Sequence, residues 1–220
     1  MPDGHDSPDG RCYLDIMNEP NATITRFYRW NAPIYDLTRW VIHRGRPAAV
    51  DALELEPGDR VLEIGCGTGL NFARLQSKVG DTGRIVGVDL STDMLARARR
   101  RQSPNVELIC EDASSLALDR QFDGVLLTYA LTIIPDWQTA IARAFEHLTG
   151  DGRLVVLDFG RTNRALAIHR RLFDWYLRLN HVHTNRDIEG ELYRHTDRVE
   201  ILRPTTGYAA LVRCRKNESA

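Results

Sequence analysis

The sequence predicts an α/β domain: a mainly parallel sheet that ends in an antiparallel hairpin, with a helical segment ahead of it. Three observations predict this fold class. Short apolar runs alternate with stretches of helical spacing through the middle of the chain. A glycine-rich turn joins the first apolar run to the helix that follows. The last two apolar runs follow each other with only a turn segment between them, as in a β-hairpin.

Each element is predicted from its own local signals. We expect parallel strands at residues 60–64, 84–89, 106–110, 122–128 and 153–159, and a hairpin made of residues 199–202 and 208–214. We expect helices at residues 47–55, from Gly69 to about Gly80, from Ser91 to about Arg101, at 136–148 and at 163–180. Gly150 to Gly152 should end the fourth of these helices. Right-handed crossovers then place helices on both faces of the sheet.

Composition limits the class of protein. The 220 residues are 43% apolar and 27% charged, which is ordinary for one folded domain. A net charge of −1 argues against a nucleic-acid partner. No apolar run is long enough to span a bilayer, and the polar, acidic first ten residues do not resemble a signal peptide. The four cysteines lack metal-ligand spacing, so we expect no metal and a cytoplasmic location.

The glycine turn indicates what kind of ligand binds. Its pattern is Gly65-x-Gly67-x-Gly69, with Glu63 two residues before the first glycine. Glycines permit backbone angles that a Cβ forbids, and they let the backbone approach a ligand closely. A carboxylate at this distance would repel a pyrophosphate, but it suits a ligand with a cationic amino-acid end.

The second predicted strand ends at another acid, Asp89, which could accept hydrogen bonds from both hydroxyls of a ribose or cap the next helix. Met94 follows one turn into that helix, where it either packs against an adenine or belongs to the core. The carboxyl ends of parallel strands share one edge of the sheet, so Glu63 and Asp89 should lie at the same ligand site.

The stretch from Val61 to Gly69 resembles motif I of the class I S-adenosylmethionine-dependent methyltransferases, and the resemblance extends over about residues 57–160. It implies a Rossmann-like, seven-stranded sheet and S-adenosyl-L-methionine as the cofactor, with Glu63 on its ammonium group. It also implies that Asp112 and Ala113 read the adenine and that Thr128 lies beside the sulfonium. The cofactor-binding positions we expect are Tyr35, Glu63, Gly65, Cys66, Gly67, Gly69, Asn71, Asp89, Leu90, Met94, Asp112, Ala113 and Thr128.

Residues 21–50 are rich in arginine and aromatic side chains and are expected to form short helices. Such helices suit an anionic membrane surface or a lid over a ligand, and equally a packing helix with a solvated arginine face. Phe27 to Arg39 resembles the lead-in of the ubiquinone/menaquinone methyltransferase-like group, and within it the bacterial phospholipid and betaine-lipid N-methyltransferases. We therefore expect a disordered or loosely ordered tail at 1–20 and a single domain at 21–220. The domain comprises a helical lid (21–50), a donor-binding core (51–160) and a C-terminal helix and hairpin (161–220).

The resemblance implies stepwise methylation of a lipid headgroup amine, with transient docking on the inner face of the membrane. Tyr28 and Tyr129 are the catalytic candidates, because aromatic faces can shelter a partly methylated ammonium by cation–π contact. No residue presents itself as a general base. The alternatives are a methyltransferase for a soluble small molecule or a quinone carbon, a nicotinamide-dependent oxidoreductase, and a donor-binding protein without catalysis.

Overall fold

The computed structural model describes residues 45–159, 186–202 and 209–217. Tyr28 and Tyr35, most of the predicted lid and the helix predicted at 163–180 lie outside the described residues. The turn expected between the two strands of the hairpin also lies outside them. The remaining expectations can be compared with the structure element by element.

The chain folds around one seven-stranded sheet, which confirms the predicted fold class. The strands are β1 (Arg60–Ile64), β2 (Arg84–Asp89), β3 (Val106–Cys110), β4 (Phe122–Thr128), β5 (Leu148–Phe159), β6 (Val199–Leu202) and β7 (Ala209–Arg215). Their order across the sheet is β3-β2-β1-β4-β5-β7-β6. The first five strands are parallel, and β7 lies antiparallel between β5 and β6.

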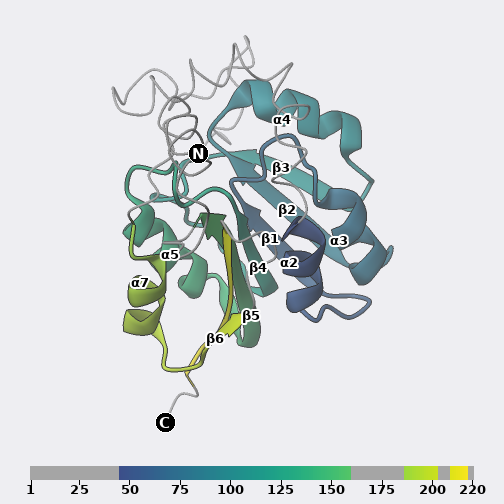
Figure 1. The fold of residues 1–220 in the computed structure, drawn as a ribbon. Coiled ribbons are helices and arrows are strands. Elements are labelled where there is room, and N and C mark those ends of the chain that lie inside the picture. Colours follow the sequence, from purple (N-terminus) through teal and green to yellow (C-terminus); the bar gives the residue numbers. More distant parts are fainter. Residues whose placement is uncertain (1–44, 160–185, 203–208, 218–220) are drawn as a thin grey trace, which may run out of the picture.

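Helices cover both faces of this sheet (Figure 1). The described helices are α2 (Arg46–Ala52), α3 (Phe72–Val79), α4 (Thr92–Ala98), the 3₁₀ turn η3 (Arg99–Arg101), α5 (Trp137–Glu146) and α7 (Ile188–His195). The first three pack on one face and α5 and α7 on the other. The helix after β2 begins as predicted, because the hydroxyl of Ser91 accepts a hydrogen bond from the backbone N–H of Met94.

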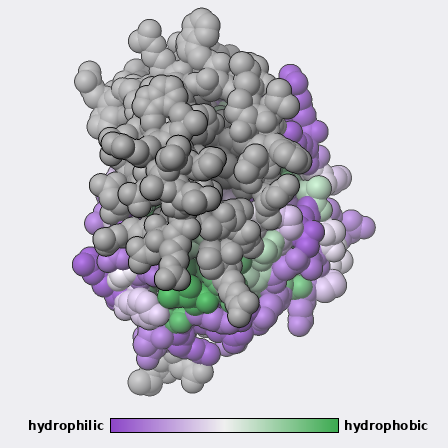
Figure 2. Space-filling model, in the orientation of Figure 1, coloured by the Kyte–Doolittle hydropathy of each residue, from purple (hydrophilic) through white to green (hydrophobic). Residues whose placement is uncertain are grey.

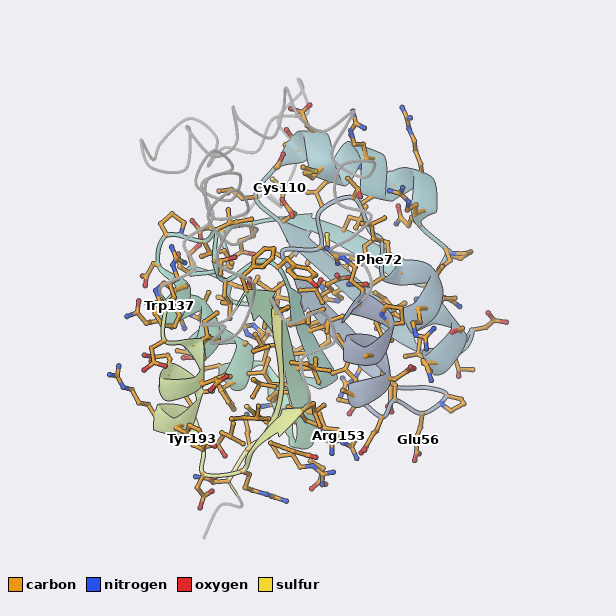
Figure 3. The ribbon with its side chains drawn as sticks, in the orientation of Figure 1. Glu56, Phe72, Cys110, Trp137, Arg153 and Tyr193 are labelled. Carbon is orange, nitrogen blue, oxygen red and sulfur yellow. The ribbon has the colours of Figure 1, made fainter. Side chains whose placement is uncertain are left out.

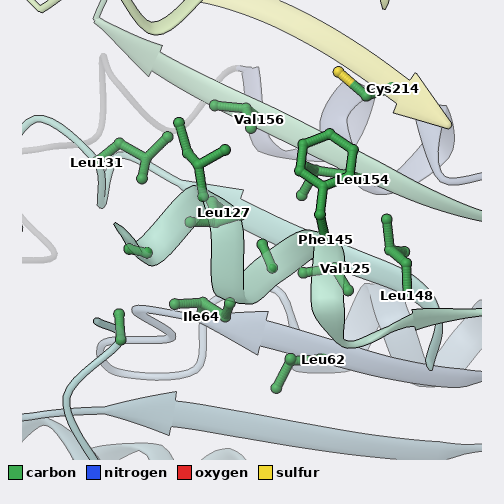
Figure 4. Close-up of a cluster of buried hydrophobic side chains, with 14 of the residues drawn as sticks. Leu62, Ile64, Val125, Leu127, Leu131, Phe145, Leu148, Leu154, Val156 and Cys214 are labelled. Carbon is green, nitrogen blue, oxygen red and sulfur yellow. The ribbon is translucent and has the colours of Figure 1, made fainter. Parts of the chain in front are cut away.

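The alternation of side chains along each strand divides the core into two layers. On β4, Leu126 points to the face of α2 and α3, while Val125 and Leu127 point to the face of α5. Figure 4 shows the second layer, where Phe145 of α5 lies over these strands. All four of these side chains are almost fully buried, so both faces of the sheet are held by apolar packing.

The described surface is mainly hydrophilic in the view of Figure 2, with one apolar area below the centre. Among the described residues, only Tyr193 and Ile201 are large apolar side chains with about half of their area exposed, each 52%. Figure 3 places Tyr193 on α7. No helix in the described ranges has both the length and the apolar character that crossing a bilayer requires.

Two elements differ from the sequence prediction. Strand β5 begins at Leu148 and runs through Gly150, where a helix stop and turn were expected. The register with β4 shifts between the pairs Phe122–Leu148 and Gly124–Arg153, so the extra residues lie in β5. Helix α7 was not predicted. Its start carries a capping signal that could have revealed it, because the side chain of Asp187 accepts a hydrogen bond from the N–H of Gly190.

Charged side chains link the end of α2 to the strands β5, β6 and β7. Glu54, just after α2, lies 2.5 Å from Arg213 of β7 and 3.1 Å from Arg153 of β5. Arg213 also pairs with Glu200 of β6 at 2.5 Å. The hydrogen bond from Arg213 is the main reason that the pKa of Glu54 is lowered. Because Glu54 is largely exposed, we expect these ion pairs to orient α2 relative to the last strands and to add little to the free energy of unfolding.

Candidate functional site

A cleft opens at the carboxyl ends of the parallel strands, between β1 and β4. This is the point where the strand order reverses, and open α/β sheets bind their ligands there. The cleft holds about 910 Å³ of empty space, part of which is open solvent at its mouth. Its walls come from the glycine loop, the ends of β2, β3 and β4, the first residue of α2 and the loop after β4.

The glycine loop has the conformation that its sequence requires. Gly65, Gly67 and Gly69 have φ angles of 70°, 56° and 75°, in the left-handed region that disfavours a Cβ. A Cβ on Gly65 would lie 2.6 Å from the Cβ of Ala130, whereas a Cβ on Gly67 would meet nothing within 4 Å. Gly65 is therefore needed for packing against the β4 loop. Gly67 leaves backbone open to the cleft, where a ligand can approach closely.

We predict that Gly65→Ala lowers the free energy of unfolding by about 1–3 kcal/mol, because a strained φ is combined with a steric overlap. Chemical denaturation followed by circular dichroism would measure this change. The matched control is Gly150→Ala, where an added Cβ has nothing within 4 Å. Equal stabilities of the two variants would contradict the packing role of Gly65.

Asp89, at the end of β2, lines the cleft and is hydrogen-bonded to the glycine loop. Its Oδ2 accepts a hydrogen bond from the backbone N–H of Gly67 at 2.8 Å, and its Oδ1 accepts one from the N–H of Ser91 at 2.9 Å. The carboxylate is thus held at the rim by two backbone donors. A carboxylate oxygen can accept more than one hydrogen bond, so Asp89 has the chemistry to receive the hydroxyls of a ribose.

Beyond Asp89, other predicted positions form the far wall of the cleft. Leu90, Met94, Asp112 and Ala113 all line it, and Met94 and Ala113 are also buried. Met94 is thus buried and also faces the cleft, and its contact with an adenine stays a prediction. Asp112 is held by a turn, since its Oδ1 accepts hydrogen bonds from the N–H and the hydroxyl of Ser114.

Glu63 lies behind the glycine loop rather than on the cleft wall. Its side chain is fully buried, and neither it nor Asn71 is among the residues that line the cleft. Glu63 Oε1 accepts a hydrogen bond from Asn71 Nδ2 at 2.6 Å, while Oε2 is buried without a hydrogen-bond partner. Burial raises the pKa of Glu63 to about 7, against the opposing influence of Arg46 and Asn71.

Cys66 lines the cleft from within the glycine loop. Its thiol is buried, and burial together with the charges of Asp89 and Glu63 raises its pKa well above the usual value. The thiol therefore stays protonated, so Cys66 acts here as a small apolar side chain and not as a nucleophile.

The end of β4 provides the remaining wall. The hydroxyl of Thr128 accepts hydrogen bonds from Arg46 Nη1 at 2.5 Å and from Asn71 Nδ2 at 3.1 Å. Tyr129 has a φ of 56°, which is unusual for an aromatic residue, and its buried ring lies 5.1 Å from that of Phe159. Strained backbone of this kind is concentrated at functional sites.

Arg46 is one of several cleft residues that sequence reasoning did not assign to the site. It is the first residue of α2, and its guanidinium lies 5.4 Å from the centre of the Tyr129 ring. The sequence carries no signal for this position, because Arg46 precedes Glu63 at no characteristic spacing and lies in a stretch with many arginines.

The fold and the cleft together define an α/β domain with a ligand cleft at the switch point of its sheet. Comparison with known proteins is consistent with this class. Residues 61–152 match the family described as a methyltransferase domain. The 2-phytyl-1,4-naphtoquinone methyltransferase of Thermosynechococcus vestitus is 34% identical over 154 residues, which cover 66% of this chain and 68% of that protein.

The demethylmenaquinone methyltransferase of Beutenbergia cavernae is 33% identical over 149 residues, 65% of this chain and 60% of that protein. Among solved structures, the DhpI–SAH complex has the same fold, with a TM-score of 0.64 at 20% identity over 90% of this chain and 97% of that one.

The chain belongs to the class I S-adenosylmethionine-dependent methyltransferases. S-adenosyl-L-methionine is its methyl donor and S-adenosyl-L-homocysteine is the product that leaves the donor site. The described residues fit this donor, because a buried carboxylate oxygen without a partner lies behind a glycine loop whose centre is open to the cleft. Within the described ranges, no three His, Cys, Asp or Glu side chains gather as metal ligands.

Proposed function

We propose that this methyltransferase acts on a ring carbon of a quinone-type small molecule that carries an apolar tail. The names of the curated relatives support this proposal, since they act on 2-phytyl-1,4-naphthoquinone and demethylmenaquinone. The lipid amine expected from the lead-in of the sequence receives no such support. That lead-in lies outside the described residues, and membrane docking rests on it alone.

The chemistry of the cleft wall agrees with an apolar acceptor. Beyond Tyr129, the loop after β4 presents Ala130, Ile133, Ile134 and Pro135 to the cleft. These side chains offer no carboxylate or hydroxyl to recognise a headgroup amine, whereas a flat ring with a hydrocarbon tail could pack against them. This loop is held in place by Arg186, which donates hydrogen bonds to the carbonyls of Leu131 and Ile134.

The donor supplies a methyl group on a positively charged sulfur, so the protein has mainly to align it with the acceptor. We assign the ribose to Asp89, the adenine to the wall formed by Met94, Asp112 and Ala113, and the ammonium to Glu63. The acceptor would lie over Tyr129. A reduced ring is electron-rich enough to be the nucleophile. Its carbon would form the new bond to methyl as the S–CH3 bond breaks to leave S-adenosylhomocysteine, and the displaced ring proton would pass to solvent.

The test is a direct comparison of acceptors. Purified protein is incubated with methyl-labelled donor and with either a reduced demethylnaphthoquinol or vesicles containing phosphatidylethanolamine, and the products are analysed by mass spectrometry. We expect one added methyl on the quinol ring and none on the lipid amine. Methylation of the lipid and not of the quinol would overturn the proposal.

Ile133→Ser is a suitable companion variant, because Ile133 lines the cleft on the acceptor side. It should lower kcat/KM for the quinol about 5- to 20-fold through lost apolar contact, with unchanged affinity for S-adenosylhomocysteine. An unchanged kcat/KM would mean that the acceptor does not pack against this loop.

A further inference from the structure

Arg46 brings a cation to the donor cleft, close enough to the buried Glu63 to influence its pKa. Its Nη1 donates to Thr128, as described, but its Nε–H is buried and has no hydrogen-bond acceptor. The residue lines the donor cleft, and it comes from α2, ahead of the segment that carries the methyltransferase motifs. A buried donor on a charged group without an acceptor is costly, and its occurrence in a native protein calls for an explanation.

A second orphaned atom of opposite charge belongs to the same network. Glu63 Oε2 is buried and without a donor, while Oε1 is taken by Asn71. The amide of Asn71 also donates to Thr128, whose hydroxyl accepts from Arg46. One chain of hydrogen bonds thus runs from the cation through Thr128 and Asn71 to the carboxylate. At its two ends, Arg46 Nε and Glu63 Oε2 are each buried without a hydrogen-bond partner.

We propose that Arg46 binds the carboxylate of the donor's amino-acid end and that, with Glu63, it forms a two-point site for the zwitterion. An α-amino acid carries an ammonium and a carboxylate on one carbon, so it needs an anion and a cation side by side. The network provides this pair at the switch point of the sheet, beside the glycine loop. The inference rests on the identity of the donor and is independent of the acceptor.

The competing assignment is that Arg46 binds an oxygen of the acceptor, since it also lies over the ring of Tyr129. The hydrogen-bond network favours the donor, because it leads from Arg46 Nη1 through Thr128 and Asn71 to Glu63 and not toward the apolar loop after β4. The two assignments predict different binding behaviour in the absence of any acceptor, which makes them separable.

The experiment measures binding of three nucleosides by isothermal titration calorimetry, without turnover. S-adenosylhomocysteine carries both charged groups, its decarboxylated analogue keeps only the ammonium, and 5′-methylthioadenosine has neither. We expect Arg46→Met to weaken S-adenosylhomocysteine about 10- to 100-fold, the range for a lost hydrogen bond to a charged group. Affinities for the decarboxylated analogue and for 5′-methylthioadenosine should stay at the wild-type values.

Arg74→Met is the matched control, because Arg74 of α3 forms an exposed ion pair with Asp51 of α2. It should leave all three affinities unchanged. If Arg46→Met lowers the three affinities by the same factor, Arg46 supports the fold of the loop and the proposal fails. If it leaves S-adenosylhomocysteine unaffected, the proposal also fails, whatever the acceptor assay finds. Should Arg46→Met not fold, Arg46→Gln gives the same decision, because it also removes the positive charge and should lose the preference for the carboxylated compound.

Discussion

Glu63→Gln will make the protein more stable than the wild type at pH 8, although it weakens donor binding. In the unfolded chain the carboxyl ionises around its ordinary pKa of 4.5, and in the folded protein around 7. Between these values the folded state holds a proton that the unfolded state has lost, so wild-type stability falls as the pH rises. The neutral amide removes this dependence, and the difference should grow from near zero at pH 4 to about 3 kcal/mol at pH 8.

Urea denaturation curves at several pH values between 4 and 8, followed by tryptophan fluorescence, would measure this difference. Glu56→Gln is the control, because Figure 3 shows Glu56 at the outer edge of the molecule and its side chain is exposed. Its stability should follow that of the wild type at each pH. Parallel curves for Glu63→Gln and the wild type would mean that Glu63 is already ionised at low pH in the folded state.

Asp89→Ala will weaken binding of S-adenosylhomocysteine by about 1–3 kcal/mol, or 10- to 100-fold. The carboxylate would accept the ribose hydroxyls, and it also holds the N–H of Gly67 and of Ser91. Its loss leaves ligand hydroxyls unpaired and loosens the glycine loop. Isothermal titration with S-adenosylhomocysteine gives the size of the effect.

Adenosine and 2′,3′-dideoxyadenosine separate these two causes. The wild type should prefer adenosine, and Asp89→Ala should lose that preference while Asp119→Ala, on an exposed loop position, retains it. A variant that weakens both nucleosides equally would assign Asp89 to the loop alone and would place the ribose elsewhere.

Much of this fold follows from local patterns in the sequence. The first four strands begin and end where their apolar runs do, because a buried parallel strand needs apolar side chains on both faces. The glycine turn and the acid at the end of β2 lie close together because the carboxyl ends of parallel strands share one edge of the sheet. The sequence prediction used the same rule. Gly67 and Asp89 are joined there by a hydrogen bond.

Other features depend on tertiary contacts that no local pattern records. The start of β5 depends on its pairing with Phe122, so a glycine pair that reads as a turn is drawn into the sheet. Glu63 is placed behind the loop because Asn71, the residue just before α3, donates a hydrogen bond to its carboxylate away from solvent. Arg46 reaches the cleft only because α2 packs against the same face of the sheet.

The ion pairs around Glu54 have a consequence for how this enzyme could change over time. They connect α2 to β5, β6 and β7 through Arg153 and Arg213, away from the glycine loop and the loop after β4. Substitutions in the loop after β4 therefore remove none of the side chains that form these ion pairs. A scaffold anchored in this way can acquire new substrates without first losing its architecture.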